Sequence, residues 1–244
     1  MTLTNHHSEN EVNQMFTRLA GRYDLMNDVV SLGTQRQWRK KFFNQLPVFK
    51  GADSLDLCCG TADLTIKLAQ LAGPRGRTIG LDFNAAMLAG GEEKIRQADL
   101  TKDIELVQGD AMNLPFEANQ FDFVTIGFGL RNVPDANQVL KEAQRVLKPG
   151  GYFACIEMSQ PTNPVVRLGW KAYFNAFPVL AKAFGGSYKD YTYLKETSMQ
   201  FVSASKLKQM MEEAGMVAVR VIPLNLGAAA IHVGQKAAPR MGRY

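Results

Sequence analysis

Residues that could bind a ligand or take part in a reaction lie at the ends of the first predicted strands. The stretch CCGTADL, residues 58–64, joins a strand to a helix with one glycine, Gly60, where a dinucleotide-binding loop would read G-x-G-x-x-G. Asp63 adds a negative charge at the start of that helix, where a phosphate would otherwise bind. The loop therefore favours a ligand without a pyrophosphate, although an ordinary tight turn would also explain one glycine.

Two further carboxylates fit the rest of such a ligand. Asp82 ends the second predicted strand, 22 residues after Gly60, at the spacing where an acidic side chain binds the hydroxyls of a ribose. Asp110 follows the third strand, on the carboxyl edge where open α/β sheets bind ligands, and is placed to accept from an adenine amino group. Together these positions indicate a nucleoside ligand with little phosphate.

A parallel α/β sheet is needed to position these loops. Between residues 54 and 157 short apolar runs alternate with helical patterns, which is typical of such a sheet. We predict strands at Ser54–Cys58, Arg77–Leu81, Ile104–Gln108, Phe121–Gly127 and Gly151–Glu157. The helix that begins near Asp135 should end at KPGG, residues 148–151. Apolar runs at 216–224 and 228–236 are too close together for a parallel crossover, so the sheet should end in an antiparallel hairpin.

Composition excludes several classes of protein. The 244 residues are 46% hydrophobic, no run of 18 apolar residues predicts a membrane span, and the first residues lack the pattern of a signal peptide. Three cysteines, two of them adjacent, argue against a disulfide framework and against a zinc site. We therefore expect a cytoplasmic protein without a metal. The net charge of +5 fits either nucleic acid or an anionic membrane surface.

This series of motifs resembles the class I S-adenosylmethionine-dependent methyltransferases. Four stretches further resemble the ubiquinone and menaquinone biosynthesis C-methyltransferases: YDLMNDVVSLGTQRQW (23–38), IGFGLRNVPD (126–135), RVLKPGGYFACIEMS (145–159) and QPTNP (160–164). The resemblance runs from about Val12 to Lys236. It departs from the family at Gln35, where histidine is usual, and at Ala62, where a second glycine often stands. Gln35 cannot transfer a proton as a histidine would, because an amide does not titrate.

The family resemblance implies a Rossmann-like class I fold. Its sheet is mostly parallel and seven-stranded, ends in an antiparallel hairpin and carries helices on both faces. Residues 1–244 would form one domain, with an N-terminal helical cap at 9–46 and an aromatic, helical insertion at 160–200 that forms a lid over the substrate.

The resemblance also implies the cofactor and its contacts. Asp82 would hold the ribose hydroxyls of S-adenosylmethionine, Asp110 and Ala111 would border the adenine, and Gly60 with Thr61 would lie against the methionine end. The implied reaction converts demethylmenaquinol to menaquinol. The alternatives are C-methylation of a benzoquinol in ubiquinone biosynthesis, or another small-molecule or RNA methyltransferase. The resemblance implies an isoprenoid quinol as partner. Because the motif of adenine N-methyltransferases is absent after the fourth strand, we expect no nucleic acid.

Methyl transfer to a ring carbon requires that the neighbouring quinol hydroxyl lose its proton. Arg131 and Asn132 follow the fourth predicted strand, and we predict that Arg131 holds the quinolate oxygen, or a water that takes the proton, while Asn132 orients it. The structural alternative for Arg131 is a surface salt bridge with Asp135. Tyr23, with Asn27, is a further candidate site residue, although its helical spacing also fits core packing.

The predicted insertion mixes aromatic and basic side chains, which suits a membrane interface. We therefore predict that residues 161–195 form a wall for the isoprenoid tail and dock peripherally on the inner face of the cell membrane; an ordinary helical lid is the alternative. A homodimer is a further expectation. The aromatic residues are Trp170, Tyr173, Phe174, Phe177, Phe184, Tyr188, Tyr191 and Tyr193, and the interleaved cations are Arg167, Lys171, Lys182 and Lys189.

Overall fold

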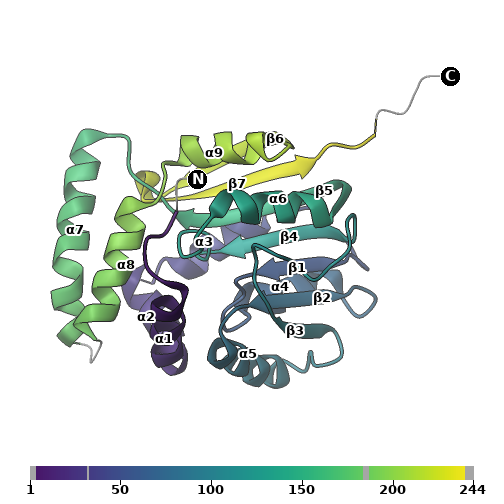
Figure 1. Ribbon diagram of the computed structural model, residues 1–244, viewed down its shortest axis with the longest axis horizontal. Coiled ribbons are helices and arrows are strands. Elements are labelled where there is room, and N and C mark those ends of the chain that lie inside the picture. The colour runs from purple at the N-terminus through teal and green to yellow at the C-terminus, as the bar shows by residue number, and fades with distance from the viewer. Residues whose placement is uncertain (1–3, 32, 184–186, 240–244) are drawn as a thin grey trace.

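One mixed sheet of seven strands organises the computed structural model, which describes residues 4–31, 33–183 and 187–239. The strand order is β3-β2-β1-β4-β5-β7-β6, and β7 runs in the direction opposite to that of the other strands. The predicted fold class, with its closing antiparallel hairpin, is confirmed (Figure 1). The strands are β1 (Ser54–Leu57), β2 (Thr78–Asp82), β3 (Ile104–Gln108), β4 (Phe121–Gly127), β5 (Leu147–Met158), β6 (Met216–Leu224) and β7 (Ala229–Lys236).

The start of β5 differs from the prediction. Helix α6 (Ala136–Val146) ends just before Leu147, and β5 already begins there, so the predicted separation of helix and strand by KPGG is wrong. Leu147 is fully buried and pairs with Phe121, which anchors the strand early. The next pair joins Phe123 to Tyr152, so the proline and glycines form a bulge inside the strand.

Helices cover both faces of the sheet. On one face α6 and α9 (Ala204–Glu213) pack their apolar stripes against β1, β4 and β5. On the other face α3 (Gln35–Phe43) and α4 (Asp63–Ala72) do the same, and α4 also packs against α5 (Ala85–Gln97) beside β3. Completely buried phenylalanines, such as Phe42 and Phe153, each contribute about 1.5–3 kcal/mol of hydrophobic stabilisation.

The N-terminal helices and the insertion pack against each other at the carboxyl ends of the parallel strands. Helices α1 (Glu9–Leu19) and α2 (Tyr23–Val30), with the short 3-10 helix η1 (Ala20–Arg22) between them, lie beside α7 (Pro164–Ala183) and α8 (Tyr188–Gln200) (Figure 1). Their shared apolar core contains Met15, Leu19, Met26, Tyr191, Tyr193 and Leu194. A second 3-10 helix, η2 (Asn225–Gly227), joins β6 to β7. No helix within the described residues is long and apolar enough to cross a membrane.

Gly80 in β2 gives a test of how tightly this sheet packs under the loops. A Cβ at this position would lie 2.7 Å from Leu106 Cδ2 and 3.0 Å from Cys59 Sγ. We expect Gly80→Ala to lower the free energy of unfolding by about 1–3 kcal/mol, because overpacking forces neighbours to move. Urea denaturation measures the change.

The matched control is Gly169→Ala in α7, where nothing lies within 4 Å of the added Cβ. Alanine is the better helix former, so this change should stabilise the protein by up to about 1 kcal/mol. Equal effects of the two substitutions would contradict the packing argument.

Candidate functional site

A cavity of about 860 Å³, its open mouth included, lies at the carboxyl ends of the strands. It forms where the strand order reverses between β1 and β4, the point at which open α/β sheets bind ligands. Five of the predicted residues lie on its wall together with Tyr23 from the N-terminal helices, whereas Thr61 and Arg131 do not. The five are Gly60, Asp82, Asp110, Ala111 and Asn132.

Gly60 and Asp82 are joined directly. The Asp82 carboxylate accepts hydrogen bonds from the backbone N–H of Gly60 at 2.8 Å and of Asn84 at 2.9 Å, one on each oxygen. Gly60 has a φ of +56°, and a Cβ there would lie 3.1 Å from the Met87 side chain. Glycine is therefore favoured at this turn. Burial raises the pKa of Asp82.

The Asp110 side chain forms a hydrogen bond within its own loop, the one that follows β3. Its Oδ1 accepts from the backbone N–H of Met112 at 2.8 Å, while Ala111 between them is buried. Phe83 also lies on the cavity wall and is 47% exposed, so a flat apolar surface stands beside the two carboxylates. Phe83 was missed from the sequence, although its place directly after Asp82 was a usable signal.

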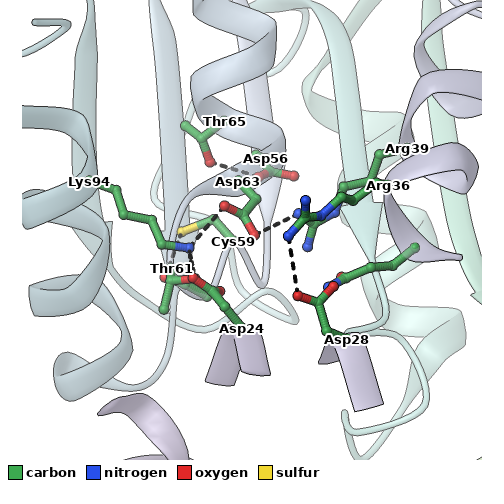
Figure 2. A network of polar contacts seen from close by, with 12 residues as sticks. Asp24, Asp28, Arg36, Arg39, Asp56, Cys59, Thr61, Asp63, Thr65 and Lys94 are labelled. Atoms are coloured by element: carbon green, nitrogen blue, oxygen red, sulfur yellow. Dashed lines mark hydrogen bonds and ion pairs between the residues drawn. The ribbon is translucent and has the colours of Figure 1, made fainter. Parts of the chain in front are cut away.

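Thr61 faces a network of charges instead of the large cavity. Its hydroxyl accepts from Lys94 Nζ at 2.8 Å and donates to Asp24 Oδ1 at 3.1 Å (Figure 2). Lys94 comes from α5 and Asp24 from α2, so this threonine fastens the N-terminal helices to the loop after β1. Thr61 lies on the wall of a smaller cavity of about 410 Å³.

Asp63 is the first residue of α4, as predicted, and its charge is compensated. Oδ1 lies 2.9 Å from Lys94 Nζ, and Oδ2 lies 2.7 Å from Arg39 Nη1 of α3 (Figure 2). The residue before it, Ala62, is completely buried and has a left-handed φ of +66°. The loop therefore presents a neutralised carboxylate, flanked by a cation from each side.

Arg131 forms a buried ion pair. Its Nη1 donates to Glu157 Oε1 at 2.6 Å and to the Phe128 carbonyl at 2.7 Å. The predicted alternative, a surface bridge to Asp135, is wrong, because Asp135 instead accepts from backbone N–H groups at the start of α6. Arg131 Nε is buried and has no hydrogen-bond partner within the described residues.

Asn132 is held in one orientation by a segment far away in the sequence. Its Nδ2 donates to the Phe128 carbonyl at 3.1 Å, and its Oδ1 accepts from the Tyr193 hydroxyl at 3.1 Å. Asn5 donates through Nδ2 to the Asn132 carbonyl and to the Tyr193 oxygen, each at 3.0 Å. Burial raises the pKa of Tyr193 to about 12, so its hydroxyl remains a donor.

His7 lies beside this arrangement, although no sequence motif singled it out. It lines the large cavity, and its ring centroid is 4.8 Å from that of Tyr193. Its Nε2 lies 3.7 Å from a carboxylate oxygen of Glu196 in α8. Asn5 and His7 were missed, and Tyr193 was predicted only as part of the insertion, because nothing local in the sequence brings them near Asn132.

Tyr23 stands between the two cavities. It lines both, its hydroxyl is hydrogen-bonded to Asn27, and burial raises its pKa. Gln35, which replaces the usual histidine, lies on neither wall; its Nε2 donates to Asp28 Oδ1 at 2.6 Å and so joins α3 to α2. The Gln35 side-chain amide therefore has a structural role, which is to connect these two helices.

The aromatic residues of the insertion are mostly inside the protein. Trp170, Phe174, Tyr191 and Tyr193 are at most 8% exposed, so the expectation that they face lipid headgroups is wrong. The exposed apolar side chains here are Val165, Leu168 and Tyr188, at 79%, 71% and 58%. Phe184 lies outside the described residues, and the side chains of Phe177 and Lys182 are also outside the description.

The cysteines contribute no charge to the site. Cys58, Cys59 and Cys155 are free thiols, and burial raises the pKa of each well above the ordinary value. Across the part of the chain that the structure describes, no three His, Cys, Asp or Glu side chains are grouped as metal ligands would be.

A model of the ubiE/COQ5 methyltransferase family matches residues 4–236. The chain belongs to this family. It is 56% identical over 236 residues to a demethylmenaquinone methyltransferase of Lactobacillus johnsonii, covering 97% of each chain. It is 48% identical to the protein of that name in Listeria welshimeri over 93% of this chain and 97% of the other. The Bacillus cereus relative is 47% identical over 93% and 96%.

Solved structures at lower identity agree on the fold of this family member. A SAM-dependent methyltransferase from Thermotoga maritima matches with a TM-score of 0.67 at 18% identity, over 92% of this chain and 99% of that one. The cyclase SpnF matches with a TM-score of 0.68 at 16% identity, over 93% and 95%. Because a cyclase shares the fold, these matches support the architecture and not the reaction.

Asp56, in β1 below the loop, gives a pH-dependent test. It is 1% exposed, accepts from Thr65 and Thr125 hydroxyls at 2.7 Å each, and burial raises its pKa from 3.8 to about 7. Between about pH 4 and 7 the folded state therefore binds more protons than the unfolded state, so this group makes stability fall as pH rises. The full change corresponds to about 4 kcal/mol.

We expect Asp56→Asn to remove this contribution, so that the variant gains stability relative to the parent as pH rises from 4 to 7. Urea unfolding at several pH values measures the difference. Asp99→Asn is the control, because Asp99 is exposed and has a left-handed φ of +56° that asparagine tolerates. A difference between Asp56→Asn and the parent that stays constant over this range would refute the assignment.

Proposed function

We propose that this protein transfers a methyl group from S-adenosylmethionine to a ring carbon of demethylmenaquinol, giving menaquinol and S-adenosylhomocysteine. The observation that carries the proposal is 56% identity, over 97% of both chains, to a protein named for that reaction. The cavity supports it, because Gly60, Asp82 and Asp110 lie on its wall at positions that suit a nucleoside without a pyrophosphate.

The cofactor-binding residues are assigned by their donors and acceptors. Asp82 already accepts one N–H on each oxygen, and a carboxylate has about four lone-pair sites, so two remain for ribose hydroxyls. Asp110 and Ala111 border the place proposed for adenine, with Phe83 beside them. The bound cofactor supplies an electrophilic methyl group on sulfur.

The protein must stabilise the quinolate. A hydroxyl with the pKa of tyrosine, about 10, requires about 2.7 kcal/mol to be lowered to 8. One placed donor typically supplies about 2.7–4 kcal/mol. Arg131 has a buried Nε that finds no hydrogen-bond partner among the described residues, and an unpaired buried donor is costly. Arg131 does not line the cavity itself but directly precedes Asn132, which does. We therefore assign its N–H to the quinolate oxygen or to a water that takes the proton, and the fixed amide of Asn132 orients that group on the cavity wall.

Arg131→Lys tests this assignment. The arginine guanidinium binds Glu157 through Nη1 and keeps its Nε–H free to donate, and lysine cannot do both in this geometry. We therefore expect turnover to fall about 100-fold while the affinity for S-adenosylhomocysteine stays unchanged. Steady-state rates with demethylmenaquinol and calorimetric titration measure the two quantities.

Arg77→Lys is the control, since Arg77 forms an exposed pair with Glu105, and it should alter neither quantity. Unchanged turnover in Arg131→Lys, with cofactor affinity also unchanged, would remove Arg131 from the mechanism.

The reaction itself is tested in cells that lack the protein. Mass spectrometry of extracted quinones should show demethylmenaquinone in place of menaquinone, because the last methyl group is not added. The same assay with a benzoquinol substrate in vitro measures the preference between the two ring systems. An unchanged quinone pool would overturn the proposed function.

We assign two elements to covering the substrate. Residues 9–46 act as the cap, since Val12, Phe16 and Tyr23 lie on the cavity wall. Residues 160–200 act as the lid, which is fastened to the cap by Arg18 and Asp190 at 2.6 Å. A groove of about 820 Å³, its mouth included, runs between α1 and α8 and shares His7 with the large cavity. We assign this groove to the isoprenoid tail, which would contact Met15 and the rings of Tyr188 and Tyr193; the other side chains of the lining are polar or charged.

Peripheral membrane contact is a separate part of the proposal. One face of α7 exposes Val165, Leu168, Ala172 and Ala176, and residues 158–189 contain four cations and no acidic residue. Apolar side chains beside cations suit an anionic bilayer surface, from which a long-tailed quinol would enter the groove. Homodimer formation stays a prediction, to be checked by the mass of the protein in solution.

Vesicle flotation tests the membrane contact. The parent protein should float with vesicles that contain anionic lipid and less with neutral ones, and Val165→Asp with Leu168→Asp should abolish this by adding charge to the apolar face. Val217→Asp is the control, because Val217 is 45% exposed on β6, away from α7. Absence of binding to anionic vesicles would exclude this part of the proposal.

A further inference from the structure

The smaller cavity, of about 410 Å³, continues the large one around the loop after β1. The two share Tyr23, Cys58, Gly127 and Phe128 on their walls. Unlike the large cavity, the smaller one has an arginine on its wall, among polar residues that come from four helices and strands and from the loop after β1. These polar residues are Asn27, Arg39, Asp56, Thr61 and Asp63.

Arg39 is the cation on this wall, and it has donors to spare. Its side chain is 25% exposed and contacts Asp63 Oδ2 through Nη1 at 2.7 Å. A guanidinium has five N–H donors, and the structure gives Arg39 no further hydrogen bond to a described residue. Arg39 therefore retains most of its capacity to bind a carboxylate.

The neighbouring cations are placed differently. Lys94 Nζ already contacts Asp24, Thr61 and Asp63, at 2.5, 2.8 and 2.9 Å, which uses its three donors. Arg36, on the same helix as Arg39, is 81% exposed, lines neither cavity, and lies 3.4 Å from Asp28 (Figure 2). Arg39 alone among these three combines unused donors with a place on a cavity wall.

We infer that the smaller cavity binds the α-amino acid end of S-adenosylmethionine and that Arg39 binds its carboxylate. This inference rests on the proposed function and extends it to a residue of α3. A guanidinium matches a carboxylate through two parallel hydrogen bonds. Asp63 and Asn27 supply oxygen acceptors on the same wall for the ammonium group. A wall with a cation and a carboxylate side by side complements a zwitterion.

The position of the cavity agrees with the length of the ligand. Asp82 and Asp110 line the large cavity, and Gly60 with Tyr23 lies at the boundary with the smaller one. A nucleoside on the two aspartates would extend its thioether chain past Gly60 toward Arg39. The N-terminal helices then bind the cofactor directly, in addition to covering it.

The test compares two ligands on the same protein. S-Adenosylhomocysteine carries the carboxylate, and its decarboxylated analogue, the 3-aminopropyl thioether of 5'-thioadenosine, does not. Calorimetry on the full chain should show that the parent binds S-adenosylhomocysteine about 10- to 100-fold more tightly than the decarboxylated analogue, as expected for hydrogen bonds between charged groups. In Arg39→Gln this preference should shrink to within about threefold, through loss of affinity for the carboxylate ligand alone.

Two more variants complete the design. Arg36→Gln, one turn away, should keep the full preference, and Arg39→Lys should keep part of it because the charge remains. A parent protein that binds both ligands equally would overturn the inference, as would equal loss of both ligands in Arg39→Gln. Failure of the parent to bind either ligand would instead refute the proposed function. An unchanged preference in Arg39→Gln would also overturn it. Where Arg39→Gln does not fold, the parent's preference still tests recognition of the carboxylate, and Arg39→Lys tests the residue.

Discussion

The pairing of Asp63 with Arg39 and Lys94 is the constraint on which the site depends. A half-buried carboxylate at the start of α4 is favoured by the helix dipole, but it still has to be neutralised away from bulk water. Its two cations come from α3 and α5, and Lys94 also reaches Asp24 of α2. The same charges that satisfy Asp63 thus help to hold the N-terminal helices, which line both cavities, against the loop after β1.

The part of the site that follows from strand ends was predictable from sequence. Gly60, Asp82 and Asp110 each lie at the end of a parallel strand or within three residues of it, and parallel strands place such residues at one end of the sheet regardless of side-chain details. Thr61 and Arg131 occupy equally suitable backbone positions, yet their side chains turn toward Lys94 and Glu157. Which way a side chain turns depends on partners that the local sequence does not contain.

The remaining errors have the same origin in long-range contacts. Asn5 and Tyr193, which fix Asn132, are separated by 188 residues, so no motif links them. The insertion looked suited to lipid because of its aromatic residues, but Tyr191 and Tyr193 are buried against α1. The β5 bulge likewise depends on Leu147 pairing with Phe121, a contact that outweighs the tendency of Pro149 and Gly150 to form a turn.

Ala62 bears on when the loop after β1 loses its conformational entropy. A left-handed alanine costs about 1–2 kcal/mol relative to a right-handed one, whereas glycine would adopt this geometry freely. Its methyl group is completely buried in the core between α4 and α5, and an alanine also restricts the unfolded chain more than a glycine does. The loop is therefore ordered when the protein folds, so a ligand that arrives later meets a rigid backbone and loses little affinity in ordering it.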